Sequence, residues 1–370
     1  MTRAAAVLAA LLAGSTGCCA CATSPTFTVR QGAALQPGPP PAPLAGSVRL
    51  LHLGDFGDDT CQQAAVASAV EAAHRRAPFD AALFAGDNLY ECGPDATLPG
   101  AEACAFGPDG AAVATPPSGP PDPAFARLHE GPLAGLSAAP AAPVYLALGN
   151  HDVAAGGGCA VRGLSPGATA RRKACLEVAH ASPRWSMPGR HYVLDRGPAR
   201  LIVIDSNVVG ADYAGFTLDD EVAFVAASSA GCDARACFLV AHHPPATAGS
   251  HHDEGPADRA ARMQRLVDAG GGRLRAWLAG HDHDLQHVRT AGGLDVLVSG
   301  NGSRQRPAER FGAVSAGGAL LFGSVSWGYG ILTVGDAGWR YRFEDDRGRA
   351  LYCCAAEGAG RCEPVSCQER

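Results

Sequence analysis

The segment Val48–Gly57, VRLLHLGDFG, joins a short apolar run to a polar cluster that follows it directly. The run has the length of a buried strand, and Gly54 with Asp55 is typical of a turn or functional loop at a strand end. The same arrangement recurs along the chain. The further runs are Ala81–Ala85, Val144–Leu148, Leu201–Ile204, Cys237–Ala241, Leu274–Ala279 and Leu294–Val298. This recurrence predicts buried strands that carry functional groups at their ends.

Alanine-rich stretches with a helical period separate several of these strands. The clearest is Gln62–Arg75, and Glu221–Ser228 and Arg259–Ala269 are further examples. Strands that alternate with helices predict an α/β fold with buried sheets. Residues 320–343 instead alternate in period two, which predicts antiparallel strands.

The composition is that of a folded globular chain of 370 residues, in which 47% are hydrophobic and 18% are charged. This length suffices for one large domain or two modest ones. The net charge is −6, whereas nucleic-acid-binding proteins usually carry a basic surplus. We therefore expect no nucleic-acid partner.

The first residues have the features of an export signal. A positive charge precedes the apolar run Ala4–Ala13, which is too short to span a membrane. We assign residues 1–22 to a signal peptide, which is either cleaved at its end or processed as a lipoprotein with a lipid on Cys18. Residues 23–46 are rich in proline, alanine and glycine and are expected to form a tether. The protein is therefore expected in the periplasm, on the outer surface as a lipoprotein, or secreted.

The cysteines agree with export. Eleven of the fourteen lie between Cys61 and Cys367, and reduced cytosolic enzymes rarely carry so many. We expect disulfides, with Cys232–Cys237 as a plausible local pair. The odd number leaves one thiol over or pairs one cysteine with the N-terminal group. The tail 346–370 should be stapled by its four cysteines, and a structural zinc site is the alternative.

Five polar clusters stand at the ends of the predicted strands, where α/β folds place functional groups. They are Gly54–Gly57 (GDFG), Gly86–Tyr90 (GDNLY), Gly149–Asp152 (GNHD), Val240–Pro244 (VAHHP) and Gly280–His283 (GHDH). Taken singly, each is weak, because an aspartate after a glycine is more often a turn or a cap than a ligand. Together they supply more ionisable groups than a packed core can hold without compensation. A pair of metal ions would compensate them.

The order D-x-G, G-D-x-x-Y, G-N-H-D, V-x-x-H, G-H-x-H resembles the signature of the purple acid phosphatases, a branch of the calcineurin-like metallophosphoesterases. Most members of that superfamily begin with D-x-H, whereas Gly57 stands at the position of the histidine here. Tyr90 lies three residues after Asp87, and this exchange of a histidine for a tyrosine marks the purple branch. Residues 184–188 and 280–286 are also similar to the small tartrate-resistant enzymes.

The resemblance covers most of the chain and implies a catalytic domain at residues 47–345. Its fold would be α/β, a metallophosphoesterase-type four-layer αββα sandwich with two packed mixed β-sheets. Its activity would be that of an acid phosphatase, which hydrolyses phosphate monoesters by attack of a metal-bound hydroxide. The cysteine-rich tail and the N-terminal segments lie outside the resemblance.

The resemblance also implies two metal sites. A ferric ion would be held by Asp55, Asp87, Tyr90 and His283. A divalent ion would be held by Asp87, Asn150, His243 and His281. The donor chemistry agrees, because carboxylates and a phenolate suit a trivalent ion, whereas imidazoles and an amide oxygen suit Zn²⁺, Fe²⁺ or Mn²⁺. His242 is expected to pack behind these ligands.

Two histidines are candidates for the acid that protonates the leaving group. His151 follows Asn150 and should face the phosphate, and His252 lies in the loop where the family keeps a substrate histidine. His251 could replace His252, and these histidines and Asn150 would contact the substrate. Asp152 is expected either to orient His151 or to cap the following turn.

Two alternatives remain open at this level. The same metal core could serve a phosphodiesterase or a nucleotide pyrophosphatase, and the motifs do not separate these activities. The pocket that would distinguish the substrates is expected to be shaped by long glycine- and proline-rich loops at 92–123 and 154–170. A non-catalytic surface binding protein with this fold is the other alternative. In the preferred interpretation the partner is a small phosphate ester, the protein is a monomer, and a membrane is reached only through an N-terminal lipid.

Overall fold

The computed structural model describes residues 28–29, 44–107, 113–137, 141–213, 215–254, 258–307 and 311–367. The expected signal peptide, including Cys18, and most of the expected tether lie outside these ranges. Within the described ranges, none of the helices has both the length and the apolar character that a membrane span requires.

The first of two large sheets has seven strands in the order β17-β16-β15-β14-β2-β3-β6. Their bounds are β2 (Val48–Leu53), β3 (Ala81–Phe84), β6 (Val144–Leu146), β14 (Gly328–Gly335), β15 (Gly338–Asp345), β16 (Ala350–Glu357) and β17 (Glu363–Pro364). β2, β3 and β6 are parallel, and the other neighbours pair antiparallel. The predictions of buried strands near the N-terminus and of antiparallel strands near residues 320–343 are confirmed.

The second sheet has eight strands in the order β1-β13-β11-β12-β10-β9-β8-β7. Their bounds are β1 (Thr28–Val29), β7 (Tyr192–Arg196), β8 (Ala199–Val203), β9 (Ala236–Val240), β10 (Leu274–Ala279), β11 (Leu285–Thr290), β12 (Asp295–Ser299) and β13 (Gly318–Ser324). β8, β9, β10 and β12 run parallel in its centre. The carboxyl ends of these four strands therefore share one edge.

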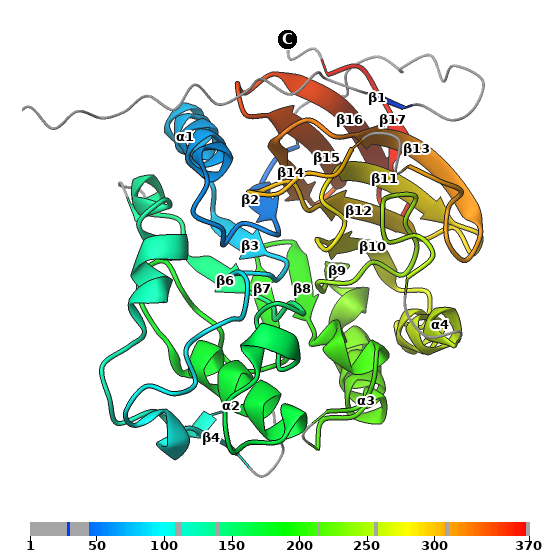
Figure 1. Cartoon of the computed structure of the whole chain (residues 1–370). Helices are drawn as coiled ribbons and strands as arrows, with labels where there is room; N and C mark the ends of the chain where they lie inside the picture. Colours follow the sequence, from blue (N-terminus) through cyan, green and yellow to red (C-terminus); the bar gives the residue numbers. More distant parts are fainter. Residues whose placement is uncertain are drawn as a thin grey trace, which may run out of the picture.

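The described residues form four α-helices, which flank the two packed sheets, and the fold is the expected αββα sandwich. They are α1 (Cys61–Arg76), α2 (Pro166–Ala179), α3 (Leu218–Ser229) and α4 (Arg259–Ala269). α1 contacts the seven-stranded sheet at β14, while α3 packs on α4 and contacts β8 (Figure 1). Thr60 caps α1, and Thr217 with Asp220 forms a capping box on α3.

The loop expected at 154–170 is wrong at its end, because α2 begins at Pro166. Ser165 accepts the Ala168 N–H as the helix cap, and a proline is well suited to the first helical position. The loop expected at 92–123 holds the small pair β4 (Ala105–Phe106) and β5 (Val113–Thr115). The remaining short helices are Ala101–Ala103, Phe125–Glu130, Ala134–Ser137, Gly157–Cys159, Ser206–Val209 and Ala230–Asp233.

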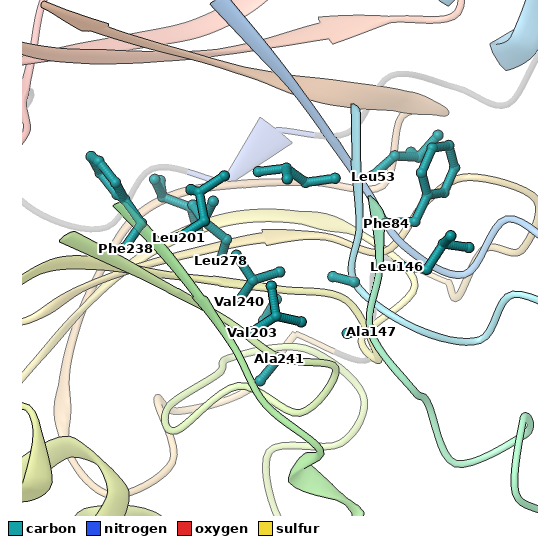
Figure 2. Packing of buried hydrophobic residues seen from close by; sticks show 14 of the residues in the cluster. Leu53, Phe84, Leu146, Ala147, Leu201, Val203, Phe238, Val240, Ala241 and Leu278 are labelled. Atoms are coloured by element: carbon teal, nitrogen blue, oxygen red, sulfur yellow. The ribbon is translucent and has the colours of Figure 1, made fainter. Parts of the chain in front are cut away.

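The main hydrophobic core includes side chains of both sheets. Leu53 and Phe84 of the seven-stranded sheet and Leu201, Phe238 and Leu278 of the eight-stranded sheet belong to one cluster (Figure 2). Each is at most 1% exposed. Full burial of such a side chain stabilises the fold by about 1.5–3 kcal/mol, so this core fixes the strand ends that precede the polar clusters.

The cysteine-rich tail forms β16 and β17, which extend the seven-stranded sheet. Asp295 at the start of β12 ties this tail to the other sheet, because its carboxylate accepts the Cys362 N–H at 2.7 Å and Arg289 Nε at 2.8 Å. His287 Nε2 lies 3.1 Å from the same carboxylate. The two sheets are therefore joined by a polar clamp as well as by the core.

Ten of the eleven cysteines between Cys61 and Cys367 form disulfides. The pairs are Cys92–Cys159, Cys104–Cys175, Cys232–Cys237, Cys353–Cys367 and Cys354–Cys362. The expected local pair Cys232–Cys237 is confirmed, and the thiol left over is Cys61. Because these ten sulfurs are paired, the alternative of a structural zinc site on them is wrong.

Candidate metal centre

The five polar clusters gather where the carboxyl ends of parallel strands from both sheets meet. Asp55 and Asp87 follow β2 and β3 of one sheet, and His242 and His281 follow β9 and β10 of the other. Asp55 Oδ2 accepts the His281 N–H at 2.8 Å, which joins the two sheets directly at this edge. The prediction that these clusters form one site is supported by this contact.

Three of these residues have a left-handed backbone, which non-glycine residues rarely adopt. The φ angles are 56° at Asp55, 53° at Asp87 and 71° at His281, and Ala316 is the fourth such residue among those described. Strained backbone of this kind costs on the order of 1–3 kcal/mol per residue and concentrates at functional sites. The fold thus holds three polar side chains in orientations that the chain does not favour locally.

The first set of predicted ligands converges at the Tyr90 hydroxyl. Tyr90 OH lies 2.9 Å from Asp55 Oδ1 and 3.3 Å from His283 Nε2, and His283 Nε2 lies 3.4 Å from Asp55 Oδ1. All three side chains are buried. Burial and the Asp55 and Asp87 charges raise the pKa of Tyr90, so a phenolate here requires a compensating cation.

Gly57 explains how Tyr90 reaches this position. A Cβ at Gly57 would lie 1.8 Å from the carbonyl oxygen of Asn88, so no side chain fits between the two loops. The Tyr90 N–H donates to Gly57 O at 2.9 Å, and the Gly57 N–H donates to Asp87 O at 3.3 Å. The glycine in D-x-G and the tyrosine in G-D-x-x-Y therefore belong to one local arrangement.

A second set converges on the Asn150 side chain. Asn150 Oδ1 lies 2.9 Å from His242 Nε2 and 3.1 Å from His281 Nδ1. His242 Nε2 lies 3.4 Å from Asp87 Oδ1. Burial lowers the pKa of His242, but the Asp87 and Asp55 charges outweigh it and raise that pKa overall. The acceptor atoms and imidazole nitrogens of this set converge on one another. A bound metal cation fits such a set, because it can replace the protons that these groups would otherwise share.

The two histidines after β9 have different surroundings. His243 was predicted as a ligand and His242 as packing, yet His242 contacts Asn150 and Asp87. His243 Nδ1 lies 2.9 Å from Ser206 Oγ, and the same hydroxyl accepts the His243 N–H at 3.0 Å. His242, His243 and His281 still lie within ligand distance of one another. The spacing V-x-x-H, counted from Val240, selects His243 and gave no signal for the contacts of His242.

The histidines at 251 and 252 also differ in their surroundings. The His252 ring turns away, because its Nδ1 lies 2.8 Å from Gly249 O and its Nε2 packs against Gly312. The His251 ring lies 4.3 Å from the His281 ring. Its Nδ1 contacts the Glu254 carboxylate, and its buried Nε2 has no hydrogen-bond partner among the described residues.

Glu254 is a site residue that the sequence reasoning missed. Its Oε2 contacts His251 Nδ1 and lies 3.4 Å from His281 Nε2. Hydrogen bonds from these two histidines lower the pKa of Glu254 although burial opposes them. The spacing of three between His251 and Glu254 was the available signal. Asp282 supports the same loop by accepting the His251 N–H at 2.9 Å.

His151 lies at the other side of the centre, with its ring 4.5 Å from the Tyr90 ring. Its Nδ1 lies 2.7 Å from Glu91 O, and its backbone N–H donates to Asp87 Oδ1 at 2.8 Å. Glu91, another residue missed from the sequence, therefore orients this ring in place of Asp152. The side chain of His151 is 27% exposed, which leaves it open to a ligand.

Asp152 holds loops together instead. Its carboxylate accepts the backbone N–H groups of Gly149 at 2.7 Å, Asn88 at 2.8 Å and Leu89 at 3.0 Å. It is fully buried. Of the two roles expected for Asp152, a local backbone cap is closer to the observed one, and this cap spans the second and third clusters.

Comparison with known proteins agrees with this architecture. Residues 48–285 match the family model described as calcineurin-like phosphoesterase. Among curated protein sequences, none matches this chain. The fold is similar to GAP50, described as the anchor in the inner membrane complex of Plasmodium, with a TM-score of 0.59, 16% identity and coverage of 84% of this chain and 89% of that one.

The fold is also similar to the purple acid phosphatase PPD1 from yellow lupin (Lupinus luteus) seeds. The TM-score is 0.57 at 12% identity, and the match covers 87% of this chain and 57% of the lupin chain. At such identities both similarities establish the fold alone.

Proposed function

Because the chain belongs to the calcineurin-like phosphoesterase family, we propose that it is a dinuclear metal hydrolase of the purple acid phosphatase type. Its substrates would be phosphate monoesters, and its activity would be highest in mild acid. The observation that carries this proposal is the convergence of Tyr90 with Asp55 and His283, since a tyrosine in this position separates the purple branch from other members.

Two groups of residues fit two ions. Asp55, Asp87, Tyr90 and His283 would hold a ferric ion. Asp87, Asn150, His242 and His281 would hold iron, zinc or manganese in the divalent state. Asp87 belongs to both groups. Its charge raises the pKa of Tyr90 on one side, and its Oδ1 lies 3.4 Å from His242 Nε2 on the other. The hard anions lie in the first group, as a trivalent ion requires.

When bound, the ions would supply activation of water and neutralise charge on the phosphoryl group. The chain's own residues perform the remaining tasks. Asn150 and His151 would orient the phosphoryl group beside the centre. His251 would hold a proton at Nε2 for the leaving oxygen, because Glu254 fixes its Nδ1 and leaves Nε2 free to face a ligand. His151, on the opposite side, is the second candidate for this acid.

We also propose that the protein works outside the cytoplasm. Five disulfides support this, because reducing compartments do not maintain them. Lipid attachment at Cys18 and free secretion are the two routes to be separated. Mass spectrometry of the mature N-terminus would distinguish them, since a lipidated chain begins at Cys18.

The similarity to GAP50 suggests one competing role, that of a non-catalytic anchor. An anchor has no need for the buried convergence of Asp55, Asp87 and Tyr90, so this donor set favours the enzyme. The two proposals differ in turnover of p-nitrophenyl phosphate. Hydrolysis of its bis ester, measured in parallel, would separate a monoesterase from a diesterase.

The decisive experiment is a visible spectrum and a metal analysis of the oxidised, iron-loaded protein. A phenolate bound to ferric iron gives a broad visible band, so the protein should be pink to purple, and Tyr90→Phe should be colourless. Tyr329→Phe is the control, because Tyr329 is also buried but donates to Glu344 instead. A colourless wild type with full iron occupancy would contradict the tyrosinate assignment.

A further inference from the structure

Arg304 places a guanidinium on the face of the Tyr90 ring. Its Cζ lies 3.8 Å from the ring centroid, well within the distance of a cation–π contact. Arg304 belongs to the segment after β12, and its neighbour Ser303 donates through N–H to Asp55 O at 2.9 Å. The guanidinium is thus carried by a segment that is itself fixed to the first cluster.

Two carboxylates hold the guanidinium in this position. Arg304 Nε donates to Asp58 Oδ2 at 2.9 Å, and Arg304 Nη2 contacts the Glu91 carboxylate. Its side chain is only 21% exposed. A planar group with fixed partners on both sides loses little freedom when it stacks on a ring, which is why arginine suits this position better than lysine.

We propose that Arg304 is a positioning residue that tunes Tyr90 electrostatically when Tyr90 is a metal ligand. This inference rests on the proposed function. A positive charge over a phenolate ring stabilises the electron density of the ring. The visible band of a tyrosinate moves electron density from the ring towards ferric iron, so Arg304 raises the energy of that transition. It also makes the phenolate a weaker donor, which raises the reduction potential of the iron.

The same guanidinium is linked to His151. Glu91 pairs with Arg304 through its carboxylate. The carbonyl oxygen of Glu91 lies 2.7 Å from His151 Nδ1, and its carboxylate lies 3.4 Å from the same nitrogen. Arg304 therefore connects the orientation of the tyrosyl ligand to that of a substrate-facing histidine. Arg304, Glu91 and Asp58 all lie outside the five sequence clusters.

The test compares visible spectra and reduction potentials of iron-loaded variants. Arg304→Gln should shift the band to longer wavelength and lower the potential, whereas Arg304→Lys, which keeps the charge, should stay close to wild type. Asp58→Asn removes an anion beside the guanidinium and should shift the band to shorter wavelength. Arg200→Gln is the matched control, because Arg200 pairs with Asp195 between β7 and β8.

The outcomes distinguish a failure of the proposed tyrosinate ligand from a failure of the role of Arg304. A colourless wild type with bound iron would remove the tyrosinate assignment itself. A coloured wild type whose band moves in neither Arg304→Gln nor Asp58→Asn would overturn the role of Arg304 alone. Equal shifts in Arg304→Gln and Arg304→Lys would also overturn it, because they would mean packing and not charge. Should Arg304→Gln fail to fold, the opposite shift in Asp58→Asn still carries the test.

Discussion

His242 and His243 follow β9 in direct succession, and their surroundings differ. His242 contacts Asn150 and Asp87, whereas His243 is held by Ser206. His242→Ala should therefore lose the divalent ion and most of the activity. His243→Ala should keep the ion and lose activity by about 10-fold, as is usual for supporting residues of a metal site. Metal analysis with kcat on a monoester checks both, and retention of two metals in His242→Ala would restore the original assignment.

His251 and His252 form a second adjacent pair with different surroundings. His251→Ala should reduce hydrolysis of esters with poor leaving groups by about 100-fold or more, since general acids contribute on this scale. Activated esters such as p-nitrophenyl phosphate should suffer less, because their leaving groups need no proton. His252→Ala is the control, because the ring of His252 faces Gly249 and Gly312. Equal losses on both ester classes would exclude His251 as the acid.

Most of the centre could be predicted from single residues, and the misses have a common cause. Asp55, Asp87, Tyr90, Asn150 and His283 converge as expected because each follows a strand end that the apolar pattern had located. The choice between two adjacent histidines depends on how the loop leaves the strand, which no spacing records. Supporting residues come from loops outside the five clusters: Arg304 has no motif that would select it, and the only signal for Glu254 was its spacing of three from His251.

At the scale of elements, Gly57 allows the loop after β3 to lie on the loop after β2. The nearest atoms to a Cβ at Gly57 are backbone atoms of Asn88 and Leu89, which cannot move aside cheaply. Gly57→Ala should therefore destabilise the fold by about 1–3 kcal/mol and displace Tyr90. Urea unfolding and the visible band measure the two effects.

Gly158→Ala is the control for this substitution, because nothing lies within 4 Å of a Cβ at Gly158. It should leave stability and colour unchanged. If Gly57→Ala behaves like Gly158→Ala, the loop contact does not determine where Tyr90 lies.

The elements themselves were predicted unevenly. β2, β10 and α4 match the expected ranges residue for residue, since a continuous apolar run or a clear helical period leaves little choice. α2 was missed because it follows a glycine-rich stretch and because its buried face includes Lys173 and Glu177. A helix that buries charged residues has no clear apolar stripe, so its period is hidden in the sequence.

At the scale of the whole molecule, two buried histidines oppose stability in acid. Burial lowers the pKa of His52 and of His129 to about 3, and the His180 and Arg184 charges add to the effect at His129. Both nitrogens of His129 lack a hydrogen-bond partner among the described residues, and its ring packs on Phe84 and Trp185. The folded protein therefore keeps these rings neutral where the unfolded chain protonates them.

The sign of the pH dependence follows from these lowered pKa values. The unfolded chain binds more protons between about pH 6.5 and 3, so stability is complete above this window and falls as the pH drops through it. Within this window, each such histidine lowers the free energy of unfolding by up to about 1.4 kcal/mol for each unit by which the pH falls. His129→Phe should therefore flatten the pH dependence of the unfolding free energy by about one proton while it keeps an aromatic ring in the core.

Urea unfolding at several values between pH 7 and 4, on wild type and His129→Phe, measures this difference. Other groups that titrate, including the metal-binding residues, contribute equally to both proteins, so the difference between the two curves isolates His129. The variant should gain on the wild type steadily as the pH falls. Parallel curves would mean that His129 is protonated within the folded state, and His129 would then not contribute to the loss of stability in acid.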